Sequence, residues 1–350
     1  MQTVNVLVMA PNLGRDLSFI ADVAPNVRVL DGNAAFAAEL VAEGSRTIAG
    51  EPASGTLPPL EERNAFLAQA DVLLMSYPVL KNIASRAPRL QWMHHTQAGV
   101  SNIWRSDIWD SQITLTSSRG FVAPTSIAQY VISGALFFGR GLYDAYLDKQ
   151  TGELDRTHYQ TTLLESTTMG IVGLGGIGQE VARLARALSM RVVATRRSAL
   201  SPQENVDGAD LLLPASQLEE LAAQSDFLAI CAALTSETEG LINSKIFRVM
   251  KPNAVIINVS RGQLVDEDAL IDALRSGRIR GAVMDVYEGE LGGGQPRREL
   301  MELPQVFVTS HVSGTGVQFA EQVRDLFREN LRRFLNDEPL RNVVDRERGY

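Results

Sequence analysis

The sequence predicts an α/β protein of two domains, each built on a doubly wound parallel sheet, with a ligand-binding cleft between them. Two observations support this fold class. Short apolar runs typical of buried strands alternate with longer amphipathic runs, first over residues 1–118 and again from Thr167 onward. A chain of 350 residues with 45% hydrophobic content is also long enough to bury two separate cores.

The first domain is expected to be flavodoxin-like, with right-handed crossovers between its strands. Its strands are predicted at residues 4–9, 72–75 and 90–93. Its helices are predicted at residues 34–42, 60–70 and 79–86. Gly, Ser and Pro residues are frequent between residues 44 and 59, which indicates a surface loop there.

In the second part of the chain, a mostly apolar run from Pro124 to Tyr146 predicts one long helix, with Thr125 or a neighbour as its cap. The following strands are predicted at residues 169–173, 191–195, 227–231, 254–258, 280–284 and 306–309. The last predicted helix, 317–334, is expected to return to the first domain. The expected domain ranges are therefore 1–118 with 312–350, and 119–311.

A glycine-rich turn between an apolar strand and an amphipathic helix predicts a Rossmann dinucleotide site. In this turn, Gly173 permits a tight bend, Gly175 permits close approach of a pyrophosphate, and Gly178 permits close packing of the helix on the strand. Gly176 and Ile177 lie between them, where the N-terminus of the helix faces the phosphate charge. The second domain is therefore expected to bind a nicotinamide dinucleotide.

The residues after the next strand indicate which dinucleotide is bound. An NAD site usually has an acidic residue there, but this chain has Arg196, Arg197 and Ser198. A guanidinium can bind the ribose phosphate of NADP through two hydrogen bonds, whereas a carboxylate would repel it. We expect NADP(H) to be preferred, with NAD(H) possible; the alternative is that both arginines are simply solvated loop residues.

Charge and composition exclude several classes of partner. The formal net charge of −8 and the pI of about 5.2 argue against nucleic acid or an anionic membrane as the main partner. The single cysteine, Cys231, lies in a strand-like run and cannot form an internal disulfide. The N-terminus has neither the pattern of a signal peptide nor that of a membrane span, so a cytoplasmic protein is expected. His94 and His95 point to opposite faces of a strand, and no metal site is expected.

Three polar residues follow predicted strands of the second domain and could together reduce a 2-keto acid. Arg261 could bind a carboxylate bidentately and polarise the neighbouring carbonyl. His311 could supply and recover a proton, and Glu290 could stabilise the charge of protonated His311. Each residue alone is typical of an ordinary surface loop, so the prediction depends on their combination.

The combination resembles the NAD(P)-dependent, D-isomer specific 2-hydroxyacid dehydrogenases. Residues 168–195 resemble the fingerprint strand and helix of that family, and DFLAICAALTSETEGLIN resembles its segment beside the adenosine half. The strongest similarities are VIINVSRGQLVDEDAL to the arginine signature, VMDVYEGE to the acid signature and SHVSG to the histidine signature. The first domain resembles the family only loosely, through HHTQAGVSNI.

The resemblance implies a role for each matching residue. Arg261 would bind the substrate, His311 would act as acid and base with Glu290 as its partner, and Asp285 would hold the nicotinamide amide. Backbone amides of the loop Ala98, Gly99 and Val100 would bind the substrate carboxylate, although an ordinary strand-to-helix turn is the alternative. Further cofactor contacts are expected at Ala232, Val259 and Gly314. The family also implies a homodimer formed through the cofactor domain.

The chain departs from the family pattern at several positions. Ser101 replaces an acidic residue, and Gln129 and Tyr130 stand where Glu and His are often found. Ala233 and Leu291 replace expected prolines, so local loop geometry should differ. Three tryptophans could form an apolar pocket for a larger substrate side chain, although core or interface positions are the commoner use. They are Trp92, Trp104 and Trp109.

We therefore expect an NADPH-preferring reductase that converts a 2-keto acid, such as glyoxylate, hydroxypyruvate or a bulkier analogue, to the D-2-hydroxy acid. Two other functions stay open at this point. A formate or phosphite dehydrogenase is one alternative, but the formate branch has Gln where this chain has Glu290. A dinucleotide-sensing binding protein similar to the corepressor relatives of the family is the other.

Overall fold

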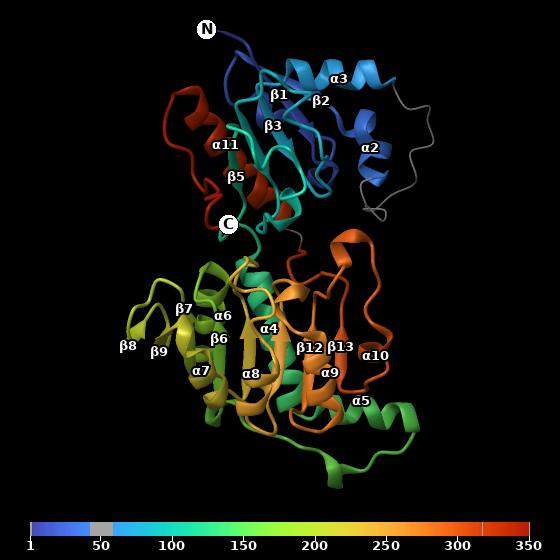
Figure 1. Ribbon diagram of the computed structural model, residues 1–350, viewed down its shortest axis with the longest axis vertical. Coiled ribbons are helices and arrows are strands. Elements are labelled where there is room, and N and C mark those ends of the chain that lie inside the picture. The colour runs from blue at the N-terminus through green and yellow to red at the C-terminus, as the bar shows by residue number, and fades with distance from the viewer. Residues whose placement is uncertain (1, 43–58, 317, 350) are drawn as a thin grey trace. The chain divides into compact units, whose positions relative to one another are not determined.

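The computed structural model describes residues 2–42, 59–316 and 318–349. The chain forms two compact units, each with its own sheet (Figure 1). Unit 1 contains Met1–Val122, Leu291–Gly293 and Gly316–Tyr350, and unit 2 contains Ala123–Glu290 and Gly294–Thr315. The loop predicted between residues 44 and 59 lies outside the described residues, apart from Pro59.

Unit 1 contains a five-stranded parallel sheet in the order β2-β1-β3-β4-β5. This order confirms the flavodoxin-like prediction. The strands are β1 (Val4–Met9), β2 (Val27–Asp31), β3 (Val72–Met75), β4 (Trp92–His95) and β5 (Thr114–Ser117). Strands β2 and β5 were not predicted, because β2 is only partly buried and β5 is a short run with Thr and Ser.

The helices of unit 1 include the last long helix of the chain. They are α1 (Ser18–Ala21), α2 (Asn33–Ala42), α3 (Leu60–Gln69) and α11 (Phe319–Leu335), with short 3-10 helices at Pro11–Leu13 and Ser101–Ile103. The ring of Phe327 in α11 stacks on Trp92 with a centroid distance of 5.2 Å. Trp92 is fully buried, so it belongs to the core and does not line a pocket. Trp104 and Trp109 form an edge-to-face pair, and Trp104 is 37% exposed.

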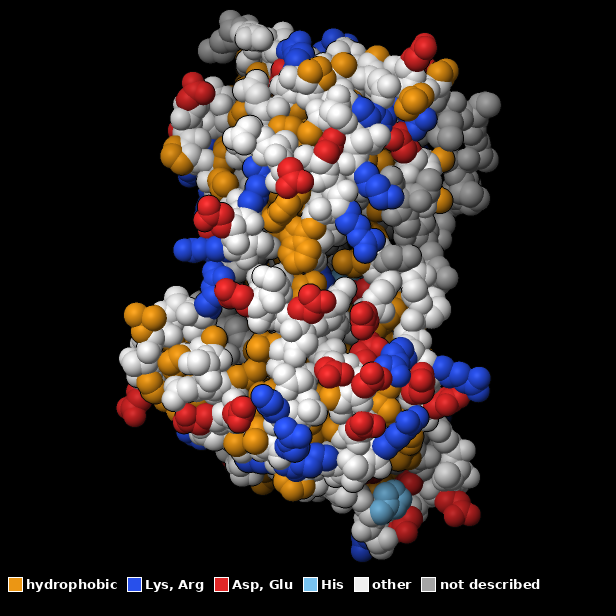
Figure 2. Space-filling model, in the orientation of Figure 1, with side chains coloured by type: hydrophobic (Ala, Val, Ile, Leu, Met, Phe, Trp, Pro, Cys, Tyr) orange, Lys and Arg blue, Asp and Glu red, His pale blue; other side chains and the backbone are white. Residues whose placement is uncertain are grey.

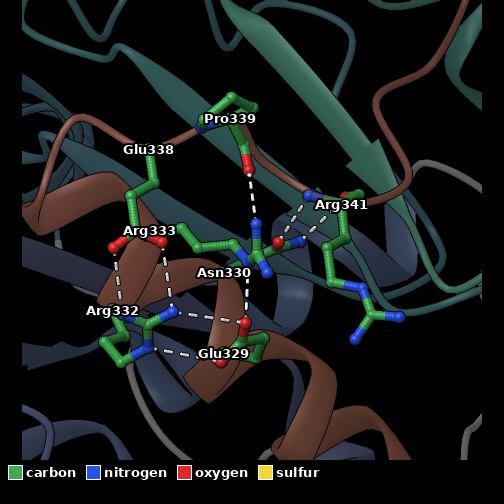
Figure 3. Close-up of polar contacts among 7 residues, drawn as sticks. All are labelled: Glu329, Asn330, Arg332, Arg333, Glu338, Pro339 and Arg341. Carbon is green, nitrogen blue, oxygen red and sulfur yellow. Dashed lines mark hydrogen bonds and ion pairs between the residues drawn. The ribbon is translucent and has the colours of Figure 1, made fainter.

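Polar contacts hold the residues that follow α11 against this helix (Figure 3). The side chain of Asn330 accepts a hydrogen bond from the amide of Arg341 and donates one to its carbonyl oxygen. Arg332 forms ion pairs with Glu329 and Glu338. Since Asn330 is fully buried, these two hydrogen bonds satisfy a side chain that would otherwise destabilise the fold.

The helix predicted at residues 79–86 is wrong, because this segment forms only turns. The amides of Ala84 and Ser85 donate to the carboxylate of Asp107 at 2.8 and 2.9 Å instead of to helix carbonyls. Leu80 is nevertheless fully buried. The apolar spacing of the segment thus predicted which side chains are buried, but not the backbone conformation.

Unit 2 contains an eight-stranded sheet in the order β13-β12-β11-β10-β6-β7-β9-β8, in which only the β8–β9 pair is antiparallel. The strands are β6 (Thr168–Val172), β7 (Arg191–Arg196), β8 (Gln203–Val206), β9 (Ala209–Pro214), β10 (Phe227–Ile230), β11 (Val255–Asn258), β12 (Gly281–Met284) and β13 (Val306–Val308). The chain order reverses between β6 and β10, which is where Rossmann folds bind their ligands. The predicted fold of this unit is therefore confirmed.

The helices of unit 2 cover this sheet. They are α4 (Pro124–Gly139), α5 (Leu142–Thr151), α6 (Gly176–Ala187), α7 (Leu218–Gln224), α8 (Ser244–Val249), α9 (Glu267–Arg275) and α10 (Arg298–Met301). Short 3-10 helices lie at Arg156–His158, Leu164–Ser166, Ala215–Gln217, Gly262–Leu264 and Glu290–Gly292.

The single helix predicted from Pro124 to Tyr146 is two helices, α4 and α5. The break occurs at Gly141, whose φ of +74° lies in the left-handed region that ends a helix. The cap was predicted at Thr125 or a neighbour, and Thr125 itself does not cap the helix. Ala123 is the cap residue, and the Thr125 hydroxyl donates a 2.9 Å hydrogen bond to Glu180 in α6.

Among the described residues, no helix is both long and apolar enough to cross a membrane. On the face shown in Figure 2, Lys and Arg side chains lie among Asp and Glu side chains. Both signs of charge therefore contribute to this surface.

Candidate active site

The glycine-rich turn joins β6 to α6, as the sequence predicts. Gly173 follows β6 with a φ of +95°, which residues with a side chain rarely adopt. A Cβ atom on Gly173 would lie 2.8 Å from the Cα atom of Ala232, and one on Gly178 would lie 2.4 Å from the carbonyl oxygen of Gly173. Neither position can accept a larger residue without a shift of the backbone.

The same turn has the features needed to hold a pyrophosphate. A Cβ atom on Gly175 would meet no heavy atom within 4 Å, so the chain leaves space beside this residue. Gly176 and Ile177 are the first residues of α6, and no side chain caps this helix. Amides in the first turn of a helix lack intrahelical partners and carry the positive end of the helix dipole. The turn therefore fits a dinucleotide phosphate.

The end of β7 carries the arginines expected to select the dinucleotide. Arg196 donates from Nε to the carbonyl oxygen of Leu174 at 3.0 Å and pairs through Nη2 with Asp207 at 2.5 Å. Arg197 lies 3.8 Å from the carboxylate of Glu237 in a looser ion pair. Ser198 follows in a turn and is exposed. The guanidinium of Arg196 is thus held beside the glycine-rich turn, but a carboxylate already contacts it.

Arg261 follows β11 in a turn that its neighbours hold in place. The side chain of Asn258, the last residue of β11, donates to the carbonyl oxygen of Arg261 at 2.9 Å and accepts from the amide of Ser260 at 3.0 Å. A Cβ atom on Gly262 would lie 2.1 Å from the carbonyl carbon of Tyr287, so only glycine fits there. Burial lowers the pKa of Arg261, and the nearby charge of Glu290 partly opposes this effect.

The structure brings His311 and Glu290 together. Nδ1 of His311 lies 3.0 Å from Oε1 of Glu290. The Glu290 side chain is only 9% exposed, whereas that of His311 is 42% exposed. A carboxylate can only accept a hydrogen bond, so Nδ1 carries the proton of this contact and Nε2 faces away from the pair. Glu290 therefore orients an imidazole that stays open to a ligand.

Asp285 holds the turn that carries His311. Its carboxylate accepts hydrogen bonds from the Thr309 hydroxyl at 2.6 Å and from the amides of Val312 and Ser313 at 2.8 and 2.9 Å. Its carbonyl oxygen accepts from the amide of His311 at 2.9 Å. His311 has a φ of +53°, an unfavourable conformation for histidine that these contacts maintain. Asp285 is fully buried, and its carboxylate contacts this turn.

The other expected cofactor contacts surround the glycine-rich turn and the histidine turn. Ala232 and Val259 follow the neighbouring strands β10 and β11, and the hydroxyl of Ser260 donates to the carbonyl oxygen of Ala232. Gly314 lies two residues beyond Val312, where a Cβ atom would be 3.7 Å from Ile127. No group of three or more His, Cys, Asp or Glu side chains within residues 2–42, 59–316 and 318–349 could hold a metal ion.

The expected carboxylate loop lies in unit 1, after β4. Ala98 and Gly99 are partly exposed, and Val100 is buried. Within the described part of the chain, no acceptor is paired with the backbone amides of these three residues. Such unpaired amides suit an anion, because each is a donor without a protein acceptor among the described residues.

A model of the D-isomer specific 2-hydroxyacid dehydrogenase NAD-binding domain matches residues 132–313. This match includes the glycine-rich turn and the three residues Arg261, Glu290 and His311. The chain belongs to the D-isomer specific 2-hydroxyacid dehydrogenase family. It is therefore an oxidoreductase whose second unit is built to bind a nicotinamide dinucleotide.

Curated relatives agree with this assignment. A glyoxylate reductase of Thermococcus onnurineus is 37% identical over 79% of this chain and 82% of that protein. A D-3-phosphoglycerate dehydrogenase of Methanocaldococcus jannaschii is 29% identical over 81% of this chain, but the match spans only 53% of that longer protein. An NADPH-dependent glyoxylate/hydroxypyruvate reductase from Sinorhizobium meliloti, solved with NADP and sulfate, has the same fold, with a TM-score of 0.76 and 23% identity over 99% of this chain and 100% of that one.

Two residues that the sequence reasoning missed contribute to the site of this family member. Asp207 pairs with Arg196, and the Asp-Gly pair at 207–208 could have indicated the hairpin that carries it. Tyr130 was noted only as a departure from the family pattern. Its hydroxyl lies 2.6 Å from that of Thr309, and so it supports the turn of His311 from α4.

Proposed function

We propose that this chain reduces 2-keto acids to D-2-hydroxy acids with NADPH as the preferred hydride donor. The observation that carries the proposal is the 3.0 Å contact of His311 with Glu290, in the same unit as the glycine-rich turn and Arg261. Arg261, Glu290 and His311 all follow the carboxyl ends of parallel strands, where ligands bind in open α/β sheets. The substrate class includes glyoxylate, hydroxypyruvate and bulkier analogues.

In this reaction the bound nicotinamide supplies the hydride. Arg261 binds the substrate carboxylate with its planar guanidinium and polarises the carbonyl that is being reduced. His311 delivers the proton from Nε2 to the carbonyl oxygen, and in the reverse direction it accepts that proton. Glu290 stabilises the positive charge on protonated His311 before the transfer.

Unit 1 would act as the substrate domain and unit 2 as the dinucleotide-binding domain. The amides of Ala98, Gly99 and Val100 would supply a further contact for the substrate carboxylate. Their half-buried loop and unpaired donors among the described residues support this assignment. Hydrogen bonds from neutral amides replace those that a carboxylate loses when it leaves water, whereas apolar side chains offer no such replacement.

A homodimer formed through unit 2 and a cytoplasmic location complete the proposal. Several large apolar side chains of unit 2 are exposed, including Leu142 at 55%, Leu154 at 82% and Leu163 at 58%. Exposed apolar residues of this size are common at interfaces between subunits. Sedimentation velocity would test the dimer, because a monomer at micromolar concentration would contradict it.

Burial raises the pKa of the Cys231 thiol to about 12, which leaves this cysteine unreactive near neutral pH.

The main test is a spectrophotometric panel of 2-keto acids, each assayed with NADPH and with NADH. We expect turnover of at least one small 2-keto acid and faster turnover with NADPH for every active substrate. Arg196→Asp should narrow or reverse this preference, because it places a negative charge where the ribose phosphate binds. Equal rates with both coenzymes in the unaltered protein would remove the argument from the arginine pair.

A second variant tests the site itself. Arg261→Ala should abolish turnover of keto acids while NADPH binding is retained, because Arg261 contacts the acid and not the dinucleotide. Equal loss of both would contradict its assigned role. Formate oxidation by the unaltered protein would favour the formate alternative. Dinucleotide binding with no turnover of any acid in the panel would favour the sensing protein.

A further inference from the structure

The hairpin β8–β9 places a carboxylate against the arginine that is expected to meet the ribose phosphate. Asp207 and Gly208 form its two-residue turn, with φ values of +50° and +86°. Both residues are thus left-handed, as in the tightest type of hairpin turn. From this turn the carboxylate of Asp207 reaches Nη2 of Arg196 at 2.5 Å. Figure 1 shows β8 and β9 beside β7, at the edge of the sheet.

The hairpin is fixed to the elements that form the dinucleotide site. Asp210, in β9, accepts hydrogen bonds from the side chain of Arg186 in α6 and from the amide of Val192 in β7, at 2.5 and 2.7 Å. A Cβ atom on Gly208 would lie 3.4 Å from the Cβ atom of Ala182 in α6, so the turn itself packs on this helix. The backbone on the C-terminal side of Asp207 is therefore fixed against α6 and β7.

The contact leaves Arg196 only partly available to a phosphate. Its Nε is bonded to the carbonyl oxygen of Leu174 and its Nη2 to Asp207. A phosphate that binds an arginine through two parallel hydrogen bonds needs two of the three guanidinium nitrogens. It must therefore share or take over Nη2, and it must do so next to a carboxylate of the same charge sign. A ribose that carries only hydroxyl groups meets no such repulsion.

We propose that Asp207 competes with the ribose phosphate of NADP(H) for Arg196, and so limits how strongly this chain favours NADP(H) over NAD(H). The proposal rests on the proposed function in one respect, namely that the adenosine ribose lies beside Arg196. Asp207 is a specificity-determining residue in this account, and it takes no part in hydride or proton transfer. Because its side chain is 45% exposed, it can turn into solvent when the phosphate binds.

The test is calorimetric titration of the unliganded protein with NADP⁺ and, separately, with NAD⁺, for the unaltered chain and for Asp207→Asn. Asparagine removes the charge but tolerates the left-handed turn. We expect the NADP⁺ dissociation constant to fall about fivefold and the NAD⁺ constant to change little, as for the loss of one partly exposed charge pair. The gain should decrease as salt is added. Asp207→Gly, which also accepts the turn, should behave in the same way.

Two controls isolate the contact. Glu204→Gln removes the same charge from an exposed position on the same hairpin and should leave both constants unchanged. In an Arg196→Gln background, Asp207→Asn should lose most of its effect on NADP⁺, because the group for which carboxylate and phosphate compete is gone.

Each other outcome overturns the proposal. Unchanged constants for Asp207→Asn would mean that no competition occurs. Weaker NADP⁺ binding would mean that Asp207 orients Arg196 toward the phosphate, and weaker NAD⁺ binding alone would mean that it accepts the ribose hydroxyls. The proposed NADPH preference is tested separately by the ratio of the two constants in the unaltered chain. Suppose that the unaltered chain binds NADP⁺ and NAD⁺ equally well, while Asp207→Asn lowers the NADP⁺ dissociation constant alone. The preference for NADPH then fails, and the competition between Asp207 and the ribose phosphate stands.

Discussion

The hydroxyl of Thr309 joins Tyr130 to Asp285, with oxygen-to-oxygen distances of 2.6 Å on both sides. The carboxylate of Asp285 in turn holds the amides on the C-terminal side of His311. Burial raises the pKa of Tyr130 to about 12, so its hydroxyl stays protonated and can act as a donor. The position of His311 therefore depends on side chains that do not themselves contact its ring.

We expect Thr309→Val to lower both stability and turnover. The substitution removes one of the three donors to the buried carboxylate of Asp285, at a cost of about 1–3 kcal/mol in the free energy of unfolding. Thr309→Ser keeps the hydroxyl and should retain near-normal turnover, so it serves as the matched control. Thermal unfolding and the kcat for a keto acid measure the two effects. Equal turnover in the Val and Ser variants would show that this hydrogen bond does not position His311.

His311→Gln should reduce kcat by about 10²- to 10⁴-fold, the range typical of general acid–base catalysis. Glu290→Gln should reduce it by a smaller factor, because glutamine still accepts a hydrogen bond from Nδ1 but offers no negative charge. NADPH binding, followed by fluorescence titration, should change little in either variant. Retention of most of the turnover by His311→Gln would exclude this residue as the proton donor.

Alanine should affect a different property at each of two glycines of the same turn, namely stability at Gly178 and NADP⁺ binding at Gly175. Gly178→Ala places a Cβ atom 2.4 Å from the carbonyl oxygen of Gly173 and should lower the melting temperature. Gly175→Ala meets no protein atom within 4 Å, so the fold should tolerate it, but its methyl group enters the space assigned to the pyrophosphate. We expect normal melting and weakened NADP⁺ binding. Unimpaired NADP⁺ binding by Gly175→Ala would place the phosphates elsewhere.

Stability should fall on acidification because of His94. Burial, with a smaller contribution from the charge of His95, lowers the pKa of His94 from 6.5 to about 3. Between these two values the unfolded chain takes up a proton that the folded chain does not, so each pH unit of acidification costs up to about 1.4 kcal/mol. The contribution of neutral, buried His94 to the free energy of unfolding is fully present above pH 6.5 and decreases toward pH 3.

Urea unfolding of the unaltered chain and of His94→Gln at pH 7 and pH 5 measures this effect. Glutamine does not titrate, so the stability advantage of the unaltered chain should shrink by up to about 2 kcal/mol between the two pH values. An advantage that stays constant with pH would mean that His94 is protonated in the folded state or is not buried there.

The sequence predicted the strands whose hydrophobic pattern matches their burial in the fold. Buried strands such as β6 and β11 are continuous apolar runs, and the catalytic candidates Arg261 and His311 lie just beyond such strands. Strand β2 was missed because half-burial leaves a charged residue, Arg28, at its second position. The segment 79–86 was misassigned because helical spacing specifies a buried face, whereas the Asp107 carboxylate decides where the amides bond.

The polar contacts within the site were harder to predict, because they join residues far apart in sequence. Tyr130 and Thr309 are 179 positions apart, and no local pattern indicates that their hydroxyls meet. The sequence likewise identified Arg196 but not the carboxylate of Asp207 that contacts it. The net charge that a ligand meets at a loop therefore cannot be predicted from the loop alone. It also depends on the hairpin or helix that faces the loop.

The hairpin β8–β9 also has a consequence for how this protein resists aggregation. It forms one edge of the larger sheet, where an edge strand offers unpaired backbone groups to a strand of another molecule. Strand β8 has only four residues, and Gln203, Glu204 and Asn205 are all exposed. A short, charged border of this kind discourages strand addition from a neighbouring molecule. Deleting strand β8 to simplify coenzyme selection would thus uncover the edge of β9, with Leu211, Leu212 and Leu213, and favour self-association.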